Sequence, residues 1–238
     1  MATRFSGIPG YVPSGPIADH IETLAGFGLP LSSIARDAGC THECVEGVLR
    51  RLWRTTRVRQ ATAIMAVSHR PNERQEIVLA IGAVRRLRAL HAIGWTWHAL
   101  SAHTPGLSAS LLSQIARPGA NRIIMSWSAW ATIRDAFEKL SGTPGTQGRA
   151  KHARLAAERR DWPAPLDWEG LDIDDPRVTA ARSGPPKVTQ RTRAADRREL
   201  ARELLELGLS VETTAARLGV TVRQVERYIR EFKSGNAA

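Results

Sequence analysis

The chain contains an internal repeat, and this repeat constrains its fold more than any other feature. The segment from Gly28 to Leu52 aligns without a gap, at an offset of 180 positions, with the segment that begins at Gly208. A third copy begins at Gly94 and contains one additional residue. Copies of one short segment fold alike, so we expect the same small module three times in the chain.

Each copy has the spacing of a helix-turn-helix. Its first glycine can end a helix, and its second glycine can make the tight turn before the last helix, because glycine enters the left-handed conformation at little cost. Two positions after the second glycine stand Thr41, Ser108 and Thr221, whose hydroxyl groups can cap the last helix. That helix carries apolar residues on one face, which in the first copy are Val45, Val48, Leu49 and Leu52. The opposite face is left to read a groove of DNA.

Segments rich in Gly and Pro separate these copies, and apolar residues recur with helical spacing throughout, while the alternation typical of strands is almost absent. We therefore predict an all-α chain with three helix-turn-helix modules. The predicted boundaries are residues 15–75, 76–145 and 191–235 for the modules, and residues 146–190 for a connector that is first basic and then acidic, with Trp and Pro.

The charge of the chain points to a polyanion as its partner. Lys and Arg number 34 against 23 Asp and Glu, which gives a net charge of +11, and all but four of the basic residues are arginine. A hydrophobic content of 42% excludes a fully disordered chain. There is no apolar stretch of membrane-spanning length, no signal-peptide pattern and no disulfide framework. We expect a cytoplasmic protein of a bacterial or phage-infected cell, associated with the nucleoid and not with a membrane.

Two resemblances agree with this expectation. The run RRELARELLELGLSVETTAARLGVTVRQVERYIREF resembles the homeodomain-like helix-turn-helix of resolvases and of sigma-factor region four. The runs RRLRALHAIGWTWHALSAHTPGLSASLLSQIAR and WPAPLDWEGLDIDDP are similar to helix-turn-helix proteins of high-GC Gram-positive bacteria and their phages, and the first copy is similar to Xre-like or repressor-like units. These resemblances imply DNA binding.

The register of the repeat places candidate DNA contacts. Arginine suits guanine, glutamine suits adenine, and a methyl group suits thymine. The candidate base-reading residues are Thr221, Val222, Arg223, Gln224 and Arg227 in the third copy, Ser108, Ser110, Ser113 and Gln114 in the second, and Thr41 and His42 in the first. The candidate phosphate contacts are Arg50, Arg51, Arg54, Arg57, Arg59, Arg117 and Arg230.

Each of these interpretations has an alternative. The arginines of the third copy could form a solvated face, and the uncharged last helix of the second copy could be a protein interface. In the first copy Glu43 and Glu46 lie where phosphates would repel them, unless a glutamate accepts from cytosine. The five acids of the connector, Asp167, Glu169, Asp172, Asp174 and Asp175, could hold a metal, but a linker that packs on a basic surface is the favoured interpretation.

No cofactor or metal is expected. Cys40, His42 and Cys44 hint at zinc, but Cys40 falls on a core position and no fourth ligand stands at finger spacing. No catalytic motif stands out, so we expect a protein that is not an enzyme. The leading hypothesis is a sequence-specific double-stranded DNA-binding protein, a transcriptional regulator or repressor of phage or mobile-element type. The alternative is a DNA-recruitment or architectural factor, such as a small terminase subunit, an excision factor or a partition adaptor. A protein partner could bind the second module or the acidic connector.

Overall fold

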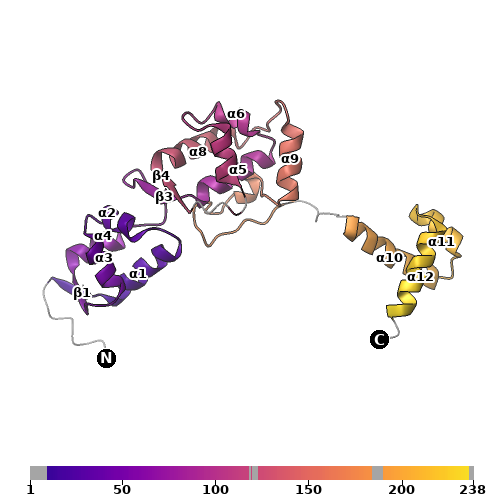
Figure 1. Cartoon of the computed structure of the whole chain (residues 1–238), viewed down its shortest axis with the longest axis horizontal. Coiled ribbons are helices and arrows are strands. Elements are labelled where there is room, and N and C mark those ends of the chain that lie inside the picture. Colours follow the sequence, from indigo (N-terminus) through magenta and orange to yellow (C-terminus); the bar gives the residue numbers. More distant parts are fainter. Residues whose placement is uncertain (1–9, 118, 120–122, 184–189, 236–238) are drawn as a thin grey trace. The chain divides into compact units, whose positions relative to one another are not determined.

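The computed structural model describes residues 10–117, 119, 123–183 and 190–235 (Figure 1). The chain divides into two compact units, residues 1–183 and residues 184–238. Both are built mainly of helices, as expected. The described part of the first unit also contains four short strands, which the sequence analysis did not predict.

The first unit contains one structural motif twice, in the order strand, three helices, strand, helix. The first repeat consists of β1 (Tyr11–Pro13), α1 (Gly15–Gly26), α2 (Leu31–Asp37), α3 (His42–Leu49), β2 (Thr55–Arg57) and α4 (Val58–Met65). The second repeat consists of β3 (Ile77–Leu79), α5 (Ile81–Ala92), α6 (Trp97–Ser101), α7 (Ala109–Ala116), β4 (Ile124–Ser126) and α8 (Trp127–Leu140).

In each repeat one strand precedes the three helices and one follows them, and the two strands pair antiparallel. The pairing therefore brings the two ends of the three-helix segment together. Val12 lies opposite Thr56 in the first repeat, and Val78 lies opposite Met125 in the second. Strands of three residues are too short to show an alternating pattern, which is why the sequence did not reveal them. A buried hydrogen bond of 2.7 Å between the hydroxyls of Ser14 and Thr56 also joins the start of the first repeat to β2.

The local signals of the helix-turn-helix pattern are confirmed in both repeats. Gly28 and Gly94 follow α1 and α5 with φ angles of 100° and 105°, a conformation that favours glycine. The hydroxyl of Thr41 accepts a hydrogen bond from the Cys44 amide at 3.3 Å, and the hydroxyl of Ser108 accepts one from the Leu111 amide at 3.2 Å. These two side chains therefore cap α3 and α7.

Each repeat has its own hydrophobic core, but the two cores adjoin. The first includes Ile21, Ile34 and Val45, and it also takes in Leu79 of β3, while Ile124 of β4 packs against it. The second core is centred on α5, α7 and α8 and contains Leu87, Leu90, Leu100, Leu112, Ile115, Trp130 and Ile133. The sheet of the second repeat thus lies between the two cores.

The apolar face predicted for the first copy is wrong at one position. Val45 and Val48 are fully buried, but Leu52 is 68% exposed. The reason is that α3 ends at Leu49, and Arg51 takes a left-handed conformation with a φ of 55°. The chain has left the helix before Leu52, so helical spacing no longer places this side chain.

Residues 150–183 differ from the expected connector because they pack as part of the first unit. The helix α9 (Ala150–Arg159) contacts α5 through a face that includes the buried Ala150, Ala153 and Ala157. Figure 1 shows α5 between α8 and α9. A 3-10 turn, η1 (Pro165–Trp168), follows and also contacts α5. This part of the chain completes the cover of α5 and does not act as a spacer.

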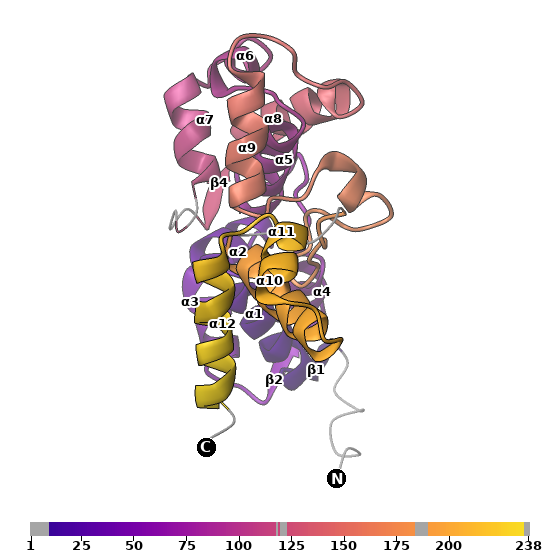
Figure 2. The same ribbon diagram turned by 90° about the vertical axis from the view of Figure 1, so that its right-hand side faces the viewer.

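The C-terminal unit consists of α10 (Gln190–Glu206), α11 (Val211–Leu218) and α12 (Val222–Gly235), and α12 contacts both other helices (Figure 2). Its buried residues include Ala201, Leu204, Ala215, Val225 and Tyr228. Gly219 ends α11 with a φ of 60°, which makes the tight turn into α12. None of the helices described in either unit has the length and apolar character that crossing a membrane would require.

Candidate nucleic-acid interface

The last helix of the C-terminal unit has one buried and one exposed face. Val225 and Tyr228 are buried against the rest of the unit, with 0% and 1% exposure. Exposed on α12 and at its start are Thr221, Val222, Arg223, Glu226, Arg227 and Arg230. Five of the six residues predicted here as DNA contacts are therefore accessible, and they come from a short stretch of one helix.

The arginines on this face differ in how they are paired. Arg227 lies 3.7 Å from Glu231 and 5.8 Å from the centre of the Tyr228 ring. Among the residues that the structure describes, no carboxylate lies within ion-pairing distance of Arg223 or Arg230. Arg223, at the start of the helix, is thus the base-reading candidate whose guanidinium group is most available.

Gln224, the sixth predicted contact, is partly engaged inside the unit. Its side-chain nitrogen donates a hydrogen bond of 3.1 Å to the hydroxyl of Tyr228, and the residue is half-buried. To read adenine with both its amide atoms, Gln224 would have to release this bond. Gln224 and Tyr228 both lie on α12, so this bond orients the Gln224 side chain along its own helix. Base reading by Gln224 stays a prediction.

Sequence reasoning did not find the contacts that hold α12 against α10. The Nε atom of Arg198 lies 3.1 Å from a carboxylate oxygen of Glu231, and its guanidinium group lies 5.8 Å from the Tyr228 ring centre. Arg202 similarly covers the ring of Phe232 at 5.3 Å. These partners are some 30 residues apart, so no local spacing in the sequence points to them. They hold the helix in place and leave its outer face free.

A comparison with protein families matches this same region. The family model described as a homeodomain-like domain matches residues 191–238. The C-terminal unit is similar to homeodomain-like helix-turn-helix domains. The match indicates DNA as the partner of this unit. The comparisons with curated proteins and with solved structures gave no match.

The last helix of the second repeat, α7, presents hydroxyl and amide groups and no charge of its own. Ser110 and Gln114 are exposed and lie 3.5 Å apart, whereas Ser113 is half-buried and Ser108 serves as the cap. Arg117 is exposed just after the helix, and its carbonyl oxygen accepts a hydrogen bond of 3.3 Å from Arg88. The structure thus brings this predicted set together on one helix.

The first repeat places acidic residues on α3. Glu46 pairs with Arg50 at 2.7 Å and lies 3.9 Å from His42. Hydrogen bonds from its own backbone amide and from the Thr41 hydroxyl lower the pKa of the exposed Glu43. The two glutamates make this helix less suited to DNA than α7 or α12.

The arginines predicted as phosphate contacts in the first repeat separate into two groups. Arg51 pairs with Asp19 of α1 at 2.5 Å, which raises the pKa of its guanidinium group, and Arg50 pairs with Glu46 as described. Arg54, Arg57 and Arg59 are exposed around β2 and the start of α4, and no carboxylate of the described residues pairs with them. The second group is the one available for phosphates.

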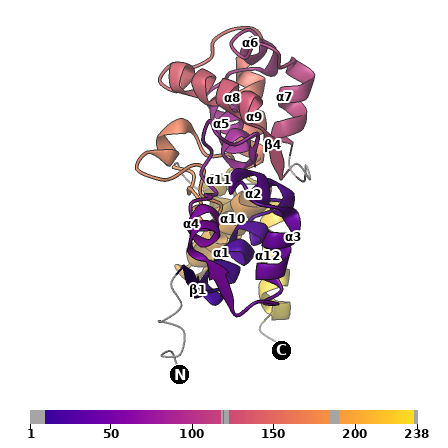
Figure 3. The same cartoon turned by 90° about the vertical axis from the view of Figure 1, so that its left-hand side faces the viewer.

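The candidate helices α3 and α7 lie along the same side of the first unit. Figure 2 shows them on the left and Figure 3, from the opposite direction, shows both on the right. A single duplex running along that side could therefore meet both helices.

The Cys-His-Cys cluster has an ordinary structural explanation. Cys40 packs against the first core, and burial together with the neighbouring Cys44 raises the pKa of its thiol to about 11. Among the described residues, no three His, Cys, Asp or Glu side chains are placed to hold a metal ion together.

The acids of the expected connector are largely engaged within the first unit. Asp167 accepts hydrogen bonds from the amides of Ala164 at 2.6 Å and Ser183 at 2.9 Å, and these bonds help to lower the pKa of the carboxyl group. Asp172, Asp174 and Asp175 pair with arginines, at distances of 2.9, 2.6 and 2.7 Å. Glu169 is exposed. These acids thus pack on arginines, as expected, but within the first unit, whereas we expected a linker between domains.

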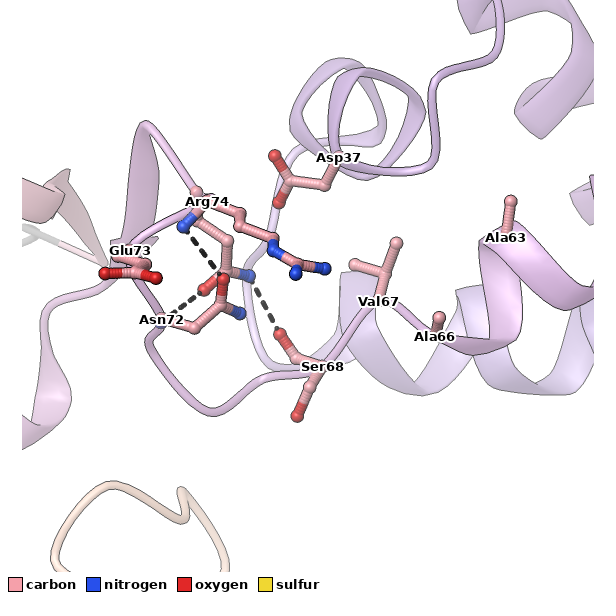
Figure 4. A pocket seen from close by; sticks show the side chains of 9 residues that line it. Asp37, Ala63, Ala66, Val67, Ser68, Asn72, Glu73 and Arg74 are labelled. Carbon is pink, nitrogen blue, oxygen red and sulfur yellow. Dashed lines mark hydrogen bonds between the residues drawn. The ribbon is translucent and has the colours of Figure 1, made fainter.

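A hollow of about 380 Å³ lies between the ends of α2 and α4 and the loop of residues 68–75 (Figure 4). The side chain of Gln75 holds this loop, because it accepts from the Asn72 amide at 3.0 Å and donates to the Ser68 carbonyl at 3.1 Å. Burial raises the pKa of Asp37 at the edge of the hollow. The polar groups here serve the loop itself, and we assign no chemistry to the hollow.

Proposed function

We propose that this chain is a sequence-specific double-stranded DNA-binding protein that acts as a transcriptional regulator of phage or mobile-element type, without catalysis. The observation that carries the proposal is α12 of the homeodomain-like unit, whose outer face presents Arg223, Arg227 and Arg230 while Val225 and Tyr228 are buried. An exposed arginine can bind the O6 and N7 atoms of guanine with two hydrogen bonds in the major groove.

The two repeats of the first unit extend this surface in the proposal. The helix α7 would read bases through Ser110, Ser113 and Gln114, with Arg117 on a phosphate, while Arg54, Arg57 and Arg59 would hold the backbone beside the first repeat. The acidic α3 would contribute positioning and little base readout. The net charge of +11 supports a long contact with DNA.

A binding selection on random double-stranded DNA tests the proposal. The full chain should enrich one motif, and Arg223→Ala should remove the preference at one or two positions of it. Arg159→Ala, at the exposed end of α9, removes the same charge elsewhere and should leave the motif unchanged. Enrichment of no motif, or equal binding to single strands, would overturn the proposal.

The regulatory part needs a separate measurement. Bound sites mapped across the genome of a cell that expresses the chain should lie at promoters, and transcription from those promoters should change. Bound sites away from promoters, with unchanged transcription, would instead favour a recruitment or architectural factor. Such a factor would also be associated with the nucleoid.

A further inference from the structure

Residues 172–178, which we name the acidic strap, are fastened to the second repeat by two arginines of α5. The Nη1 atom of Arg85 donates hydrogen bonds to the carbonyl oxygens of Ile173 at 2.9 Å and Asp175 at 2.7 Å, and Nη2 donates to that of Val178. The terminal nitrogens of Arg86 donate to the two carboxylate oxygens of Asp174 at 2.6 and 2.8 Å. Arg86 is buried, so this pair is shielded from solvent.

The same strap also reaches the first repeat and the loop that follows it. Asp172 pairs with Arg70 at 2.9 Å, and a carboxylate oxygen of Asp175 lies 3.8 Å from the Nε2 atom of His69. The guanidinium group of Arg177 lies 5.7 Å from the ring centre of Phe27, at the end of α1. Cation and ring attract each other at this distance.

Further contacts join the two repeats beside the strap. The Ile123 side chain lies against Gly28, so closely that a Cβ atom at this position would be 2.1 Å from it. Arg36 of α2 pairs with Glu76, just before β3. The strap therefore reinforces an interface between the two repeats that an apolar contact and an ion pair already form.

We propose that the acidic strap fixes the spacing and orientation of α3 relative to α7, so that the first unit accepts DNA of only one internal spacing. Arg70, Asp172 and Arg177 are the positioning residues. This inference rests on the proposed DNA-binding function and adds a source of specificity to it. One added base pair turns the duplex by about 35° and lengthens it by roughly 3.4 Å, so a rigid pair of repeats cannot follow it.

The first test measures the repeats without DNA. Spin labels at S32C and E138C, both exposed, in a chain with Cys40 and Cys44 replaced by serine, report the distance between the repeats. The labelled chain with an unmodified strap should give one narrow distribution of distances between the two labels. The double variant Arg70→Ala with Arg177→Ala should give a broader distribution. Arg70→Lys, which retains a cation for Asp172, should keep it narrow. An unchanged distribution in the double variant overturns the proposal.

The second test uses the selected DNA motif with one or two base pairs inserted within the part that the first unit protects. The unmodified chain should lose about tenfold or more in affinity, and the double variant should lose less than threefold on the same DNA. Arg74→Ala, in the loop but away from the strap, is the control. Equal losses in both proteins overturn the proposal. If the unmodified chain binds no DNA, the proposed function fails, while the distance measurement still decides whether the strap fixes the repeats.

Discussion

The carboxylate of Asp174, which binds both terminal nitrogens of Arg86, lies directly over Gly82 on the same helix. A Cβ atom at Gly82 would be 1.7 Å from the Oδ1 atom of Asp174. Alanine normally stabilises a helix relative to glycine, by about 1 kcal/mol. At this position the added methyl group would instead displace the carboxylate that neutralises a buried guanidinium group.

We therefore expect Gly82→Ala to lower the free energy of unfolding of the first unit by about 1–3 kcal/mol, the usual cost of overpacking. Urea unfolding followed by circular dichroism measures this change. Gly26→Ala in α1 is the matched control and should be neutral or stabilising, because the added Cβ would have no described atom within 4 Å beyond its chain neighbours and the backbone of its own helix. A stabilised Gly82→Ala variant would show that Asp174 is not held over the helix.

The arginines around β2 should differ in their effect on DNA binding. Replacing Arg54, Arg57 and Arg59 with alanine should flatten the dependence of log affinity on log salt by about one unit for each lost phosphate contact. Arg51→Ala should leave the slope nearly unchanged, because Arg51 is paired with Asp19. Salt titrations by fluorescence anisotropy compare the variants. The opposite order of slopes would place Arg51 on DNA.

Arg223 should contribute specificity and not only charge. Arg223→Ala should weaken binding to the selected site by about 1–3 kcal/mol, and Arg223→Lys should lose most of the same preference because lysine lacks the planar pair of donors. Binding to unrelated DNA should fall for Arg223→Ala and stay nearly constant for Arg223→Lys. If Arg223→Lys keeps the full preference, this residue contacts a phosphate.

The strap should loosen in acid. Hydrogen bonds from Arg177 lower the pKa of the buried Asp175 well below its usual range. A depressed carboxyl pKa contributes stability that is complete above the unfolded-state pKa of about 3.9 and is lost as the pH falls toward the folded-state value. The difference in unfolding free energy between the unmodified chain and Asp175→Asn should thus be constant from pH 5 to 8 and shrink below about pH 4. A constant difference down to pH 2 would contradict this assignment.

The Cys40 thiol should resist alkylation. With its pKa raised to about 11 by burial, only a small fraction is thiolate at neutral pH, and the thiolate is the reactive form. In the unmodified chain, the rate of iodoacetamide labelling at Cys40, distinguished from Cys44 by mass spectrometry of the labelled peptide, should still rise about tenfold between pH 9 and 10. A rate that levels off over this interval would indicate an ordinary thiol.

The parts of the fold that depend on local signals could be predicted from the sequence. Thr41 and Ser108 cap α3 and α7 through contacts three residues away, and Gly28 and Gly94 follow helices, so spacing alone indicated them. The acidic strap could not be predicted in detail, because Arg86 and Asp174 are 88 residues apart.

The candidate site shows the same division. The exposed arginines of α12 follow from helical periodicity within one short segment. Arg51, predicted as a phosphate contact, pairs with Asp19, which is 32 residues away, and no pattern in the sequence indicates this pairing. Helical spacing also failed at Leu52, because the left-handed turn at Arg51, which is not a glycine, leaves no compositional sign.

The antiparallel pairing of β1 with β2, and of β3 with β4, has a consequence for how such a chain can grow. Each pair brings the first strand of a repeat beside the strand that follows its three helices. A tandem duplication of the coding segment would therefore add a second repeat with its own strand pair and leave the strand pair of the first repeat intact. Once two copies exist, their outer helices are free to diverge separately. The acidic α3 and the uncharged α7 are what such independent drift from a common ancestor would leave.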